Sequence, residues 1–228
     1  MKKNIIYSNL ENFKVDYFDP IFWKSLNKIE KIGEGRADAY LIKRDDQQWV
    51  LKEYLRGGKI SYLLSNQYFY FNKNQIRPIK EWEMINHLFI SGLPVARPIG
   101  LLIKKGLLSY RASLITEYIP FSKTLLDVIK SGDNVNKEIW VAVGQMIKQF
   151  HEYDISHPDI NVRNVLVDNL GRIYLIDFDK AAVTYSRRKL DSNLLRLKRS
   201  IVKHLSSIKG TDKAYSYVMQ GYNINSTA

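Results

Sequence analysis

Alternating apolar and polar residues predict mostly β-structure in the first half of the chain. Apolar runs between residues 28 and 55 are separated by short polar stretches, which is typical of antiparallel strands. Two more runs follow before residue 120. The expected strands are Lys28–Gly33, Ala39–Lys43, Trp49–Leu55, Gly100–Lys104 and Ala112–Tyr118.

Other parts of this half have a different pattern. Trp82, Ile85 and Leu88 recur at helical spacing, which predicts a helix over Lys80–Ser91. Residues 1–20 are polar and mixed, and we expect an arm lying on an N-terminal lobe. The segment 62–74 predicts an irregular loop or a short helix.

Helical patterns dominate the second half. We expect a short helix over Lys123–Lys130 and a long one over Lys137–Tyr153, with an apolar stripe that belongs to the core. His151 near its end is read as structural, where a positive imidazole would be favourable. The fold class is α+β, with an N-terminal lobe over residues 1–120 and a mostly helical C-terminal lobe over 121–228.

The stretch from His157 to Lys180 carries the most specific chemistry. Asp159 and Asn164 follow His157 in the pattern H-x-D-x-x-x-x-N, and Asp177 stands 18 positions after Asp159. Asp159 can accept a proton from an acceptor hydroxyl. Asn164 and Asp177 offer the oxygen ligands that Mg²⁺ prefers, and a hairpin between them would bring them together. The pattern predicts a phosphotransferase site, although residues 168–171 alone form an ordinary turn.

Phosphate-binding candidates precede this stretch. Gly33 and Gly35 permit close backbone approach to phosphate, although such a loop is also a common hairpin turn. Lys52 follows on an apolar strand, where a charged partner or a phosphate is needed, although it could also be a solvent-facing lysine on an edge strand. Glu81 on the predicted helix could reach Lys52, whereas Glu83 faces elsewhere.

Two further places suggest ligand contacts. Leu114–Pro120 resembles the hinge of kinases, where backbone groups of Glu117 and Ile119 would pair with adenine. Arg56 and Lys59 beside two glycines could receive an acidic substrate or a phosphate, or belong to a solvated turn.

Composition adds a strong charge bias. The 228 residues carry a net charge of +12, which calls for an anionic partner. Cysteine is absent, so disulfides and cysteine-based zinc sites are excluded. No secretory signal or membrane-spanning run is found, which predicts a soluble or peripheral protein.

The basic residues gather near the end of the chain. Residues 187–209 contain eight Lys or Arg against one acid, Asp191. An apolar stripe of Leu194, Leu197, Ile201 and Leu205 would pack inward and leave Arg196, Arg199 and Lys203 on a basic face. This face suits an anionic lipid surface or an acidic acceptor, although it could also be a solvated helix face.

The chain resembles the 3-deoxy-D-manno-octulosonic acid (Kdo) kinases of the lipopolysaccharide core kinase family, within the protein-kinase-like superfamily. The resemblance rests on Tyr54–Gly58, Gly92–Pro98, Leu114–Glu117, Asp177–Lys180 and Asn193–Ser200. It implies a bilobal fold and ATP- and Mg²⁺-dependent transfer to a Kdo hydroxyl of Kdo-lipid A. The expected place is the cytoplasmic side of the inner membrane, as a peripheral protein, with no specific nucleic acid as partner.

Matching positions assigns roles to individual residues. Asp159 would be the catalytic base, Asn164 and Asp177 the metal ligands, Lys52 the phosphate-binding lysine and Glu81 its partner. Arg56, Lys59, Arg196 and Arg199 would neutralise the acceptor's anionic groups, and Arg163 has no assigned role.

Departures from protein kinases leave alternatives open. Asn161 stands where protein kinases usually carry a lysine, Asp179 replaces a glycine, and no A-P-E motif follows. A small sugar-acid acceptor fits better than a peptide. The alternatives are a heptose kinase, an aminoglycoside-type kinase, a protein kinase and an inactive nucleic-acid-binding module.

Overall fold

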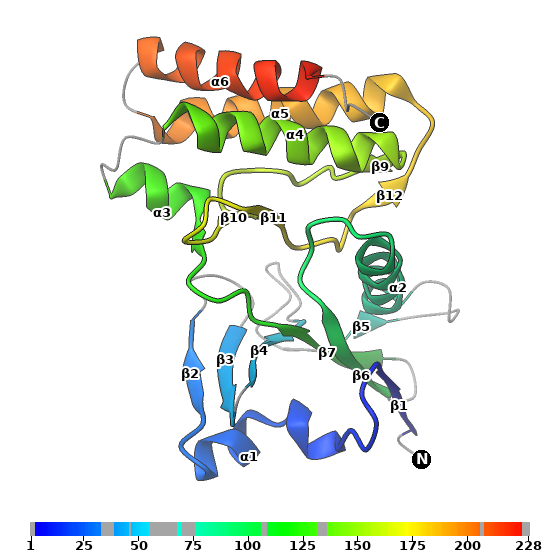
Figure 1. Cartoon of the computed structure of the whole chain (residues 1–228). Coiled ribbons are helices and arrows are strands. Elements are labelled where there is room, and N and C mark those ends of the chain that lie inside the picture. The colour runs from blue at the N-terminus through cyan, green and yellow to red at the C-terminus, as the bar shows by residue number, and fades with distance from the viewer. Residues whose placement is uncertain are drawn as a thin grey trace. The chain divides into compact units, whose positions relative to one another are not determined.

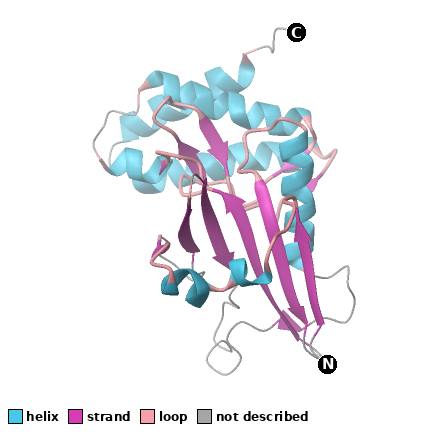
Figure 2. Ribbon diagram, turned by 60° about the horizontal axis from the view of Figure 1, so that its bottom comes forward, coloured by secondary structure: helices cyan, strands magenta, loops and turns pink. Residues whose placement is uncertain are grey.

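The computed structural model describes residues 3–32, 39–45, 47–54, 68–69, 76–105, 109–131, 136–205 and 208–224. The chain divides into two compact units. The first contains Met1–Asn86 and Arg97–Tyr118, and the second contains His87–Ala96 and Ile119–Ala228. Strands dominate the first unit and helices the second (Figures 1 and 2), which confirms the α+β class.

A seven-stranded antiparallel sheet forms the first unit. Its order is β1-β6-β7-β4-β3-β2, with β5 also paired to β7. The five predicted strands are present as β2, β3, β4, β6 and β7, with ends that differ by a few residues. The bounds of the seven strands are β1 Lys3–Ser8, β2 Ile29–Lys31, β3 Ala39–Arg44, β4 Gln47–Glu53, β5 Tyr68–Phe69, β6 Pro98–Lys105 and β7 Ser109–Glu117.

The N-terminal segment differs from the expected arm. Strand β1 pairs along its whole length with β6, and a 3-10 helix, η1 (Val15–Phe18), and helix α1 (Pro20–Ser25) follow. Phe18 and Trp23 are buried in one hydrophobic cluster with Trp49. The segment is therefore a strand and part of the core. Its apolar run of two residues was too short to predict a strand.

The predicted loop or short helix over 62–74 is also corrected in part. Tyr68–Phe69 forms strand β5 against β7. The other residues of that segment lie outside the described ranges.

Helix α2 (Arg77–Ile90) begins three residues before the predicted start. Pro78 lies in its first turn, where proline is tolerated because no intrahelical N–H bond is lost. The helix is followed by Gly92, whose φ of 75° favours glycine. Glu81 on this helix is 2% exposed, so it needs hydrogen-bonding partners.

Helices α4, α5 and α6 lie side by side in the second unit (Figure 1). The predicted stripe on α4 is buried, as expected for core residues. Gly144 and Gly221 let α4 and α6 approach closely, because a Cβ on either glycine would lie about 2 Å from a backbone oxygen of the other helix. The bounds are α3 Leu125–Lys130, α4 Lys137–Glu152, α5 Arg187–His204 and α6 Ile208–Asn223.

Short strands support the loops of this unit. β10 (Val165–Val167) pairs with β11 (Ile173–Leu175), which confirms the predicted hairpin, and with β8 (Lys123–Thr124). β9 (Ile155–Ser156) pairs with β12 (Ala182–Val183). Thr124 and Asp127 form a capping box that fixes the start of α3.

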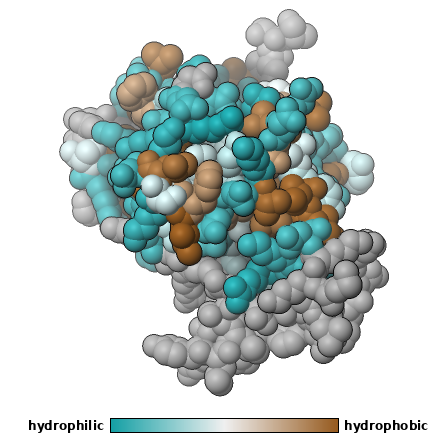
Figure 3. All heavy atoms as spheres, turned by 90° about the horizontal axis from the view of Figure 1, so that it is seen from below, coloured by the Kyte–Doolittle hydropathy of each residue, from teal (hydrophilic) through white to brown (hydrophobic). Residues whose placement is uncertain are grey.

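Seen from the side of α1, the described residues form several separate apolar patches (Figure 3). Apolar patches there are interrupted by polar side chains (Figure 3), and Ile21 and Leu26 are exposed. Among the described residues, no helix is both long and apolar enough to cross a membrane.

Candidate active site

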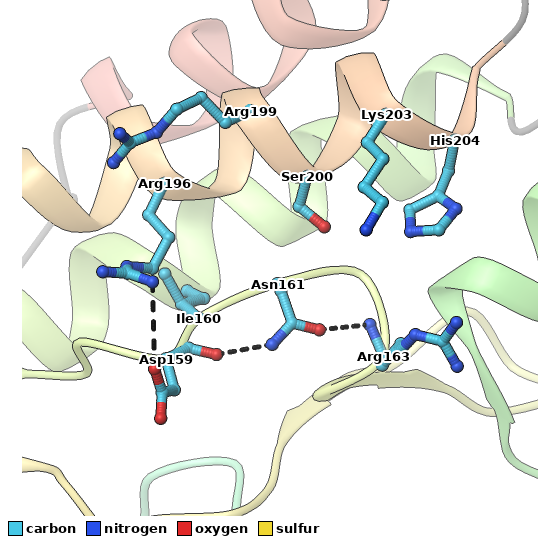
Figure 4. Close-up of a pocket in the computed structure, with 9 residues that line it drawn as sticks. All are labelled: Asp159, Ile160, Asn161, Arg163, Arg196, Arg199, Ser200, Lys203 and His204. Carbon is cyan, nitrogen blue, oxygen red and sulfur yellow. Dashed lines mark hydrogen bonds and ion pairs between the residues drawn. The ribbon is translucent and has the colours of Figure 1, made fainter. Parts of the chain in front are cut away.

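The loop from His157 to Asn164 joins β9 to β10, and hydrogen bonds between its own residues hold its conformation. The side-chain amides of Asn161 and Asn164 both donate to the backbone carbonyl of Asp159, at 2.6 and 3.0 Å. Asn161 Oδ1 also accepts the backbone N–H of Arg163 at 2.8 Å (Figure 4). Asn161 therefore holds the loop in shape where protein kinases carry a lysine.

The Asp159 carboxylate lies between two cations. Lys180 Nζ is 2.6 Å from Oδ2, and Arg196 Nη1 is 3.8 Å from Oδ1. The Asp159 side chain is 35% exposed, and those of Lys180 and Arg196 are about half exposed. Ion pairs this exposed contribute about 0–1 kcal/mol, so a ligand can displace either cation at small cost.

The hairpin brings Asn164 and Asp177 to neighbouring positions. The backbone N–H of Ile176 donates to the carbonyl of Asn164 at 3.0 Å, and β10 pairs Val165 with Leu175. Asp177 is exposed and has a φ of 68°, in the left-handed region. The predicted proximity of these two residues is thus present.

The donor set fits Mg²⁺ held partly by a nucleotide. No cluster of three His, Cys, Asp or Glu side chains able to hold a metal occurs in the described part of the chain. Mg²⁺ in phosphate-transferring sites commonly takes one or two carboxylates and completes its shell with phosphate oxygens and water. Because the Asn164 amide nitrogen donates to Asp159, its side-chain oxygen is the atom left for a cation. The metal-ligand role of Asn164 and Asp177 stays a prediction.

His157 links the start of the loop to Ile176 and Phe178. Its Nε2 lies 3.2 Å from the carbonyl oxygen of Ile176, and its ring packs edge-on against Phe178 with centroids 5.2 Å apart. Burial lowers the pKa of His157, with the nearby Asp177 charge opposing it. The neutral ring therefore donates from Nε2, and Nδ1 has no hydrogen-bond partner among the described residues.

Two side chains of helix α5 form hydrogen bonds with the same loop. Asn193 Oδ1 accepts the backbone N–H of His157 at 2.9 Å, and Ser200 Oγ accepts that of Val162 at 3.2 Å. These residues are seven positions apart, or about two helical turns. Arg196, which reaches Asp159, lies between them. The predicted inward stripe on this helix is confirmed for Leu194, Leu197 and Ile201, which are buried, whereas Leu205 follows the last helical residue and is half-buried.

His151 belongs to the buried polar network behind this helix. Its Nδ1 lies 2.9 Å from the Tyr222 hydroxyl, and its Nε2 lies 3.3 Å from Asn193 Oδ1. Burial lowers the pKa of His151, although the Asn193 contact opposes this. His151 is buried in this network, in agreement with the structural role predicted for it, and burial disfavours the positive ring that a helix C-terminus would favour.

A basic pocket of about 390 Å³ opens beside Asp159. Arg196, Arg199 and Lys203 reach it from α5 and Arg163 from the loop, with His204 at the end of the helix (Figure 4). Partial burial and the nearby charges of Arg163, Lys203 and Lys130 lower the pKa of His204. Arg196 and Arg199, predicted as acceptor contacts, are thus brought together with the predicted base. Arg163, left without a role, faces the same pocket.

The first unit holds a second cluster. Lys52 Nζ is 3.1 Å from Glu81 Oε1, and the Tyr54 hydroxyl donates to Glu81 Oε2 at 2.5 Å. The Lys52 ammonium also lies 5.0 Å from the centre of the Tyr54 ring. Because Lys52 and Tyr54 are two residues apart along an extended chain, they share a face and hold Glu81 together. The predicted pairing of Lys52 with Glu81 is present, and its role toward phosphate stays a prediction.

The remaining candidates are only partly described. Gly33, Gly35, Arg56 and Lys59 lie outside the described residues. The backbone N–H of Glu117 donates to the carbonyl of Arg97 at 2.8 Å. The carbonyl of Ile119 accepts the backbone N–H of Ser122 at 3.3 Å. Adenine pairing at Glu117 and Ile119 therefore stays a prediction.

Sequence reasoning missed three residues that the structure places in these clusters. Tyr54, Lys180 and Asn193 contact Glu81, Asp159 and His157, respectively. A polar residue next to the apolar stripe of α5 was the available signal for Asn193. The sequence offered no comparable signal for Lys180.

Comparison with known proteins agrees with this arrangement. Residues 21–222 match the Lipopolysaccharide kinase (Kdo/WaaP) family. The chain belongs to this family. It is 30% identical over 187 residues to the 3-deoxy-D-manno-octulosonic acid kinase of Vibrio cholerae, covering 82% of this chain and 79% of that protein.

Two similar relatives have the same name. The protein from Photobacterium profundum is 29% identical over 209 residues, covering 91% of this chain and 88% of the relative. The one from Vibrio parahaemolyticus is 31% identical over 188 residues, covering 82% and 79%. The family and these relatives support the kinase-like bilobal fold that the sequence predicts.

Proposed function

We propose that this protein transfers the γ-phosphate of ATP to a hydroxyl of Kdo in Kdo-lipid A, during assembly of the lipopolysaccharide inner core. Membership of the lipopolysaccharide kinase family supports the reaction class, and the names of its relatives support the sugar. The observation that carries the proposal is the position of Asp159, which faces a basic pocket on a loop next to Asn164 and Asp177. A neutral acceptor would gain little from so basic a pocket.

Asp159 orients the acceptor hydroxyl in this mechanism. The hydroxyl oxygen attacks the γ-phosphorus, the bond between that phosphorus and the bridging oxygen breaks, and ADP leaves. The hydroxyl proton passes to the Asp159 carboxylate. Positioning and charge stabilisation supply most of the catalysis, because the phosphoryl group needs little covalent help.

Lys180 has a place in the same step. Its ammonium contacts Asp159 at 2.6 Å, so it lies near the point where the hydroxyl meets the phosphorus. Asn161 supplies no charge there, since its amide braces the loop. Lys180 is therefore placed to neutralise charge on the transferred phosphoryl oxygens.

ATP and its metal are bound by the remaining candidates. Lys52, held by Glu81, contacts the phosphates together with backbone groups near Gly33 and Gly35, and Glu117 and Ile119 pair with adenine. Asn164 and Asp177 would hold Mg²⁺, which neutralises phosphate charge when bound. The buried Glu81 carboxylate pairs with the Lys52 ammonium at 3.1 Å and so holds it in one position.

Acceptor binding uses the basic pocket. Arg196 and Arg199 pair with the Kdo carboxylate close to Asp159, which brings the sugar hydroxyls to the base. Arg56 and Lys59, which lie outside the described residues, would add positive charge for binding the anionic acceptor. A heptose acceptor would lack the carboxylate that this arrangement favours.

The protein works at the cytoplasmic side of the inner membrane as a peripheral enzyme. Helix α5 carries exposed Leu195 and Val202, spaced by two turns, among basic side chains. Such a face can enter the headgroup region of an anionic lipid surface while its cations pair with lipid phosphates. A lipid-linked acceptor would be met there.

The test compares wild type with Asp159→Ala. Wild type should transfer label from γ-labelled ATP to Kdo-lipid A, and Asp159→Ala should lose turnover while keeping its affinity for ATP. The matched control is Asp191→Ala, which removes a half-exposed acid of the same unit that pairs with Arg187. Turnover like that of wild type in Asp159→Ala would remove Asp159 from the role of base.

A further inference from the structure

The basic pocket is longer than one carboxylate can occupy. Arg196 contacts Asp159 at one end, and Lys203 lies seven residues further along α5, near His204 (Figure 4). Seven residues of α-helix correspond to about 10 Å along the axis. A single carboxylate bound beside Arg196 therefore leaves the far end of the pocket without an anion.

Charge at the far end is not balanced by the protein. Arg163 and Lys203 form no ion pair with an acid among the described residues. Like charges held together repel one another, and a pocket lined by one sign of charge attracts counter-ions. The effect reaches His204, whose pKa is lowered by burial and by the charges of Arg163, Lys203 and Lys130.

The geometry of these side chains suits a phosphate group. Arg163 approaches from the loop, and Lys203 and His204 from the end of α5, so donors converge from two elements (Figure 4). A phosphate carries up to two charges and three acceptor oxygens, and it can accept from all of them. One carboxylate offers fewer acceptors and less charge.

We infer that the pocket is a two-anion acceptor site, in which Arg163 and Lys203 bind a phosphate group on the sugar backbone next to the acid sugar, about 10 Å from the carboxylate subsite. This rests on the proposed function and names a second recognition element of the acceptor. An acceptor that presents both anions is aligned along α5, because each anion meets its own cations. The acid sugar alone, without the phosphate, would bind more weakly, and its position along α5 would be less well defined.

The test pairs two acceptors with three variants. Kdo-lipid A is compared with the same acceptor after removal of the phosphate on the sugar that bears Kdo. Lys203→Gln removes one far-end cation, Arg196→Ala removes the carboxylate-side cation, and Lys189→Gln is an exposed control on α5 outside the pocket. Melting temperatures show whether each variant is folded.

For wild type we expect kcat/KM to fall about 10- to 100-fold when the phosphate is removed. Lys203→Gln should lower kcat/KM by a similar factor for the phosphorylated acceptor and have almost no effect on the dephosphorylated one. Arg196→Ala should lower both, and Lys189→Gln neither. Inorganic phosphate should compete with the acceptor in wild type and less in Lys203→Gln.

Two outcomes would overturn the inference in different ways. Equal effects of Lys203→Gln on both acceptors, with turnover of both by wild type, would remove the phosphate subsite and leave the proposed function intact. Turnover of neither acceptor by a folded, ATP-binding wild type would overturn the proposed function and the subsite together.

Discussion

Asn193 Oδ1 accepts the backbone N–H of His157 at 2.9 Å, so a buried helix side chain fixes the first residue of the loop that carries Asp159. The Asn193 amide nitrogen also lies 3.3 Å from Ser156 Oγ. This connection explains why an amide stands beside the apolar stripe of α5. Helix α5 and the loop therefore hold each other in position, and Arg196 lies one turn after Asn193 on the helix.

Replacing Asn193 by alanine should destabilise the protein and slow turnover. The substitution leaves the buried His157 N–H without its acceptor, which costs about 1–3 kcal/mol. Urea denaturation measures this loss, and kcat should fall because Asp159 is less firmly placed. Ser192→Ala, on an exposed neighbour, should stay within about 0.5 kcal/mol of wild type. If Asn193→Ala were as stable as wild type, this hydrogen bond would contribute nothing to the free energy of unfolding.

Tyr54→Phe should weaken the cluster that positions Lys52. The Tyr54 hydroxyl donates to the buried Glu81 carboxylate, and hydrogen bonds to charged groups contribute about 1.5–3 kcal/mol. We expect a loss of stability in this range and a several-fold rise in KM for ATP. Tyr7→Phe is the control, since no hydrogen bond of the Tyr7 hydroxyl is found in the described part of the chain. Equal effects of both substitutions would argue against a specific role of Tyr54.

Lys180→Ala should lower kcat about 10- to 100-fold and leave ATP affinity nearly unchanged. The reason is that the ammonium next to Asp159 neutralises charge that develops during transfer. Lys180→Arg should retain part of the rate, because it keeps the charge. Lys43→Ala, which breaks an exposed pair with Glu30, is the matched control. An unchanged kcat in Lys180→Ala would show that Lys180 contacts Asp159 in the free enzyme but does not assist phosphoryl transfer.

Stability should fall as the pH drops below about 6.5. Burial lowers the pKa of His151 and His157 below the ordinary histidine value of 6.5, so the unfolded chain binds more protons than the folded one in this range. Urea denaturation at several values from about pH 5 to 7.5 measures the dependence. His151→Gln should flatten it, because glutamine does not titrate. A free energy of unfolding that rises on acidification would contradict the assigned directions.

The sequence predicted the regular elements well, for physical reasons. Apolar alternation marks β3 and β4, and helical periodicity marks α2 and α4, because each element buries one face. The strand β1 was missed since its apolar run is short and its pairing with β6 joins residues far apart in the chain. Local pattern contains no information about such pairing.

The part of the candidate site that lies within the sequence motif could be predicted, because the motif spacing determines which residues meet. The loop and hairpin brought Asp159, Asn164 and Asp177 into one region, as the spacing indicated. Contacts between distant residues could not be predicted. Tyr54 and Glu81 are 27 positions apart, and His157 and Asn193 are 36 apart. Which polar groups meet at such separations depends on the packing of whole helices.

Phosphate transfer from labelled ATP and Mg²⁺ to Kdo-lipid A tests the central claim most directly. Lipid A lacking Kdo and a heptose-bearing core are run beside it, with ATP binding measured on the same preparation. We predict label on the Kdo-bearing acceptor and none on lipid A lacking Kdo. Label on the heptose-bearing core alone, or no transfer with ATP binding intact, would contradict the proposed function.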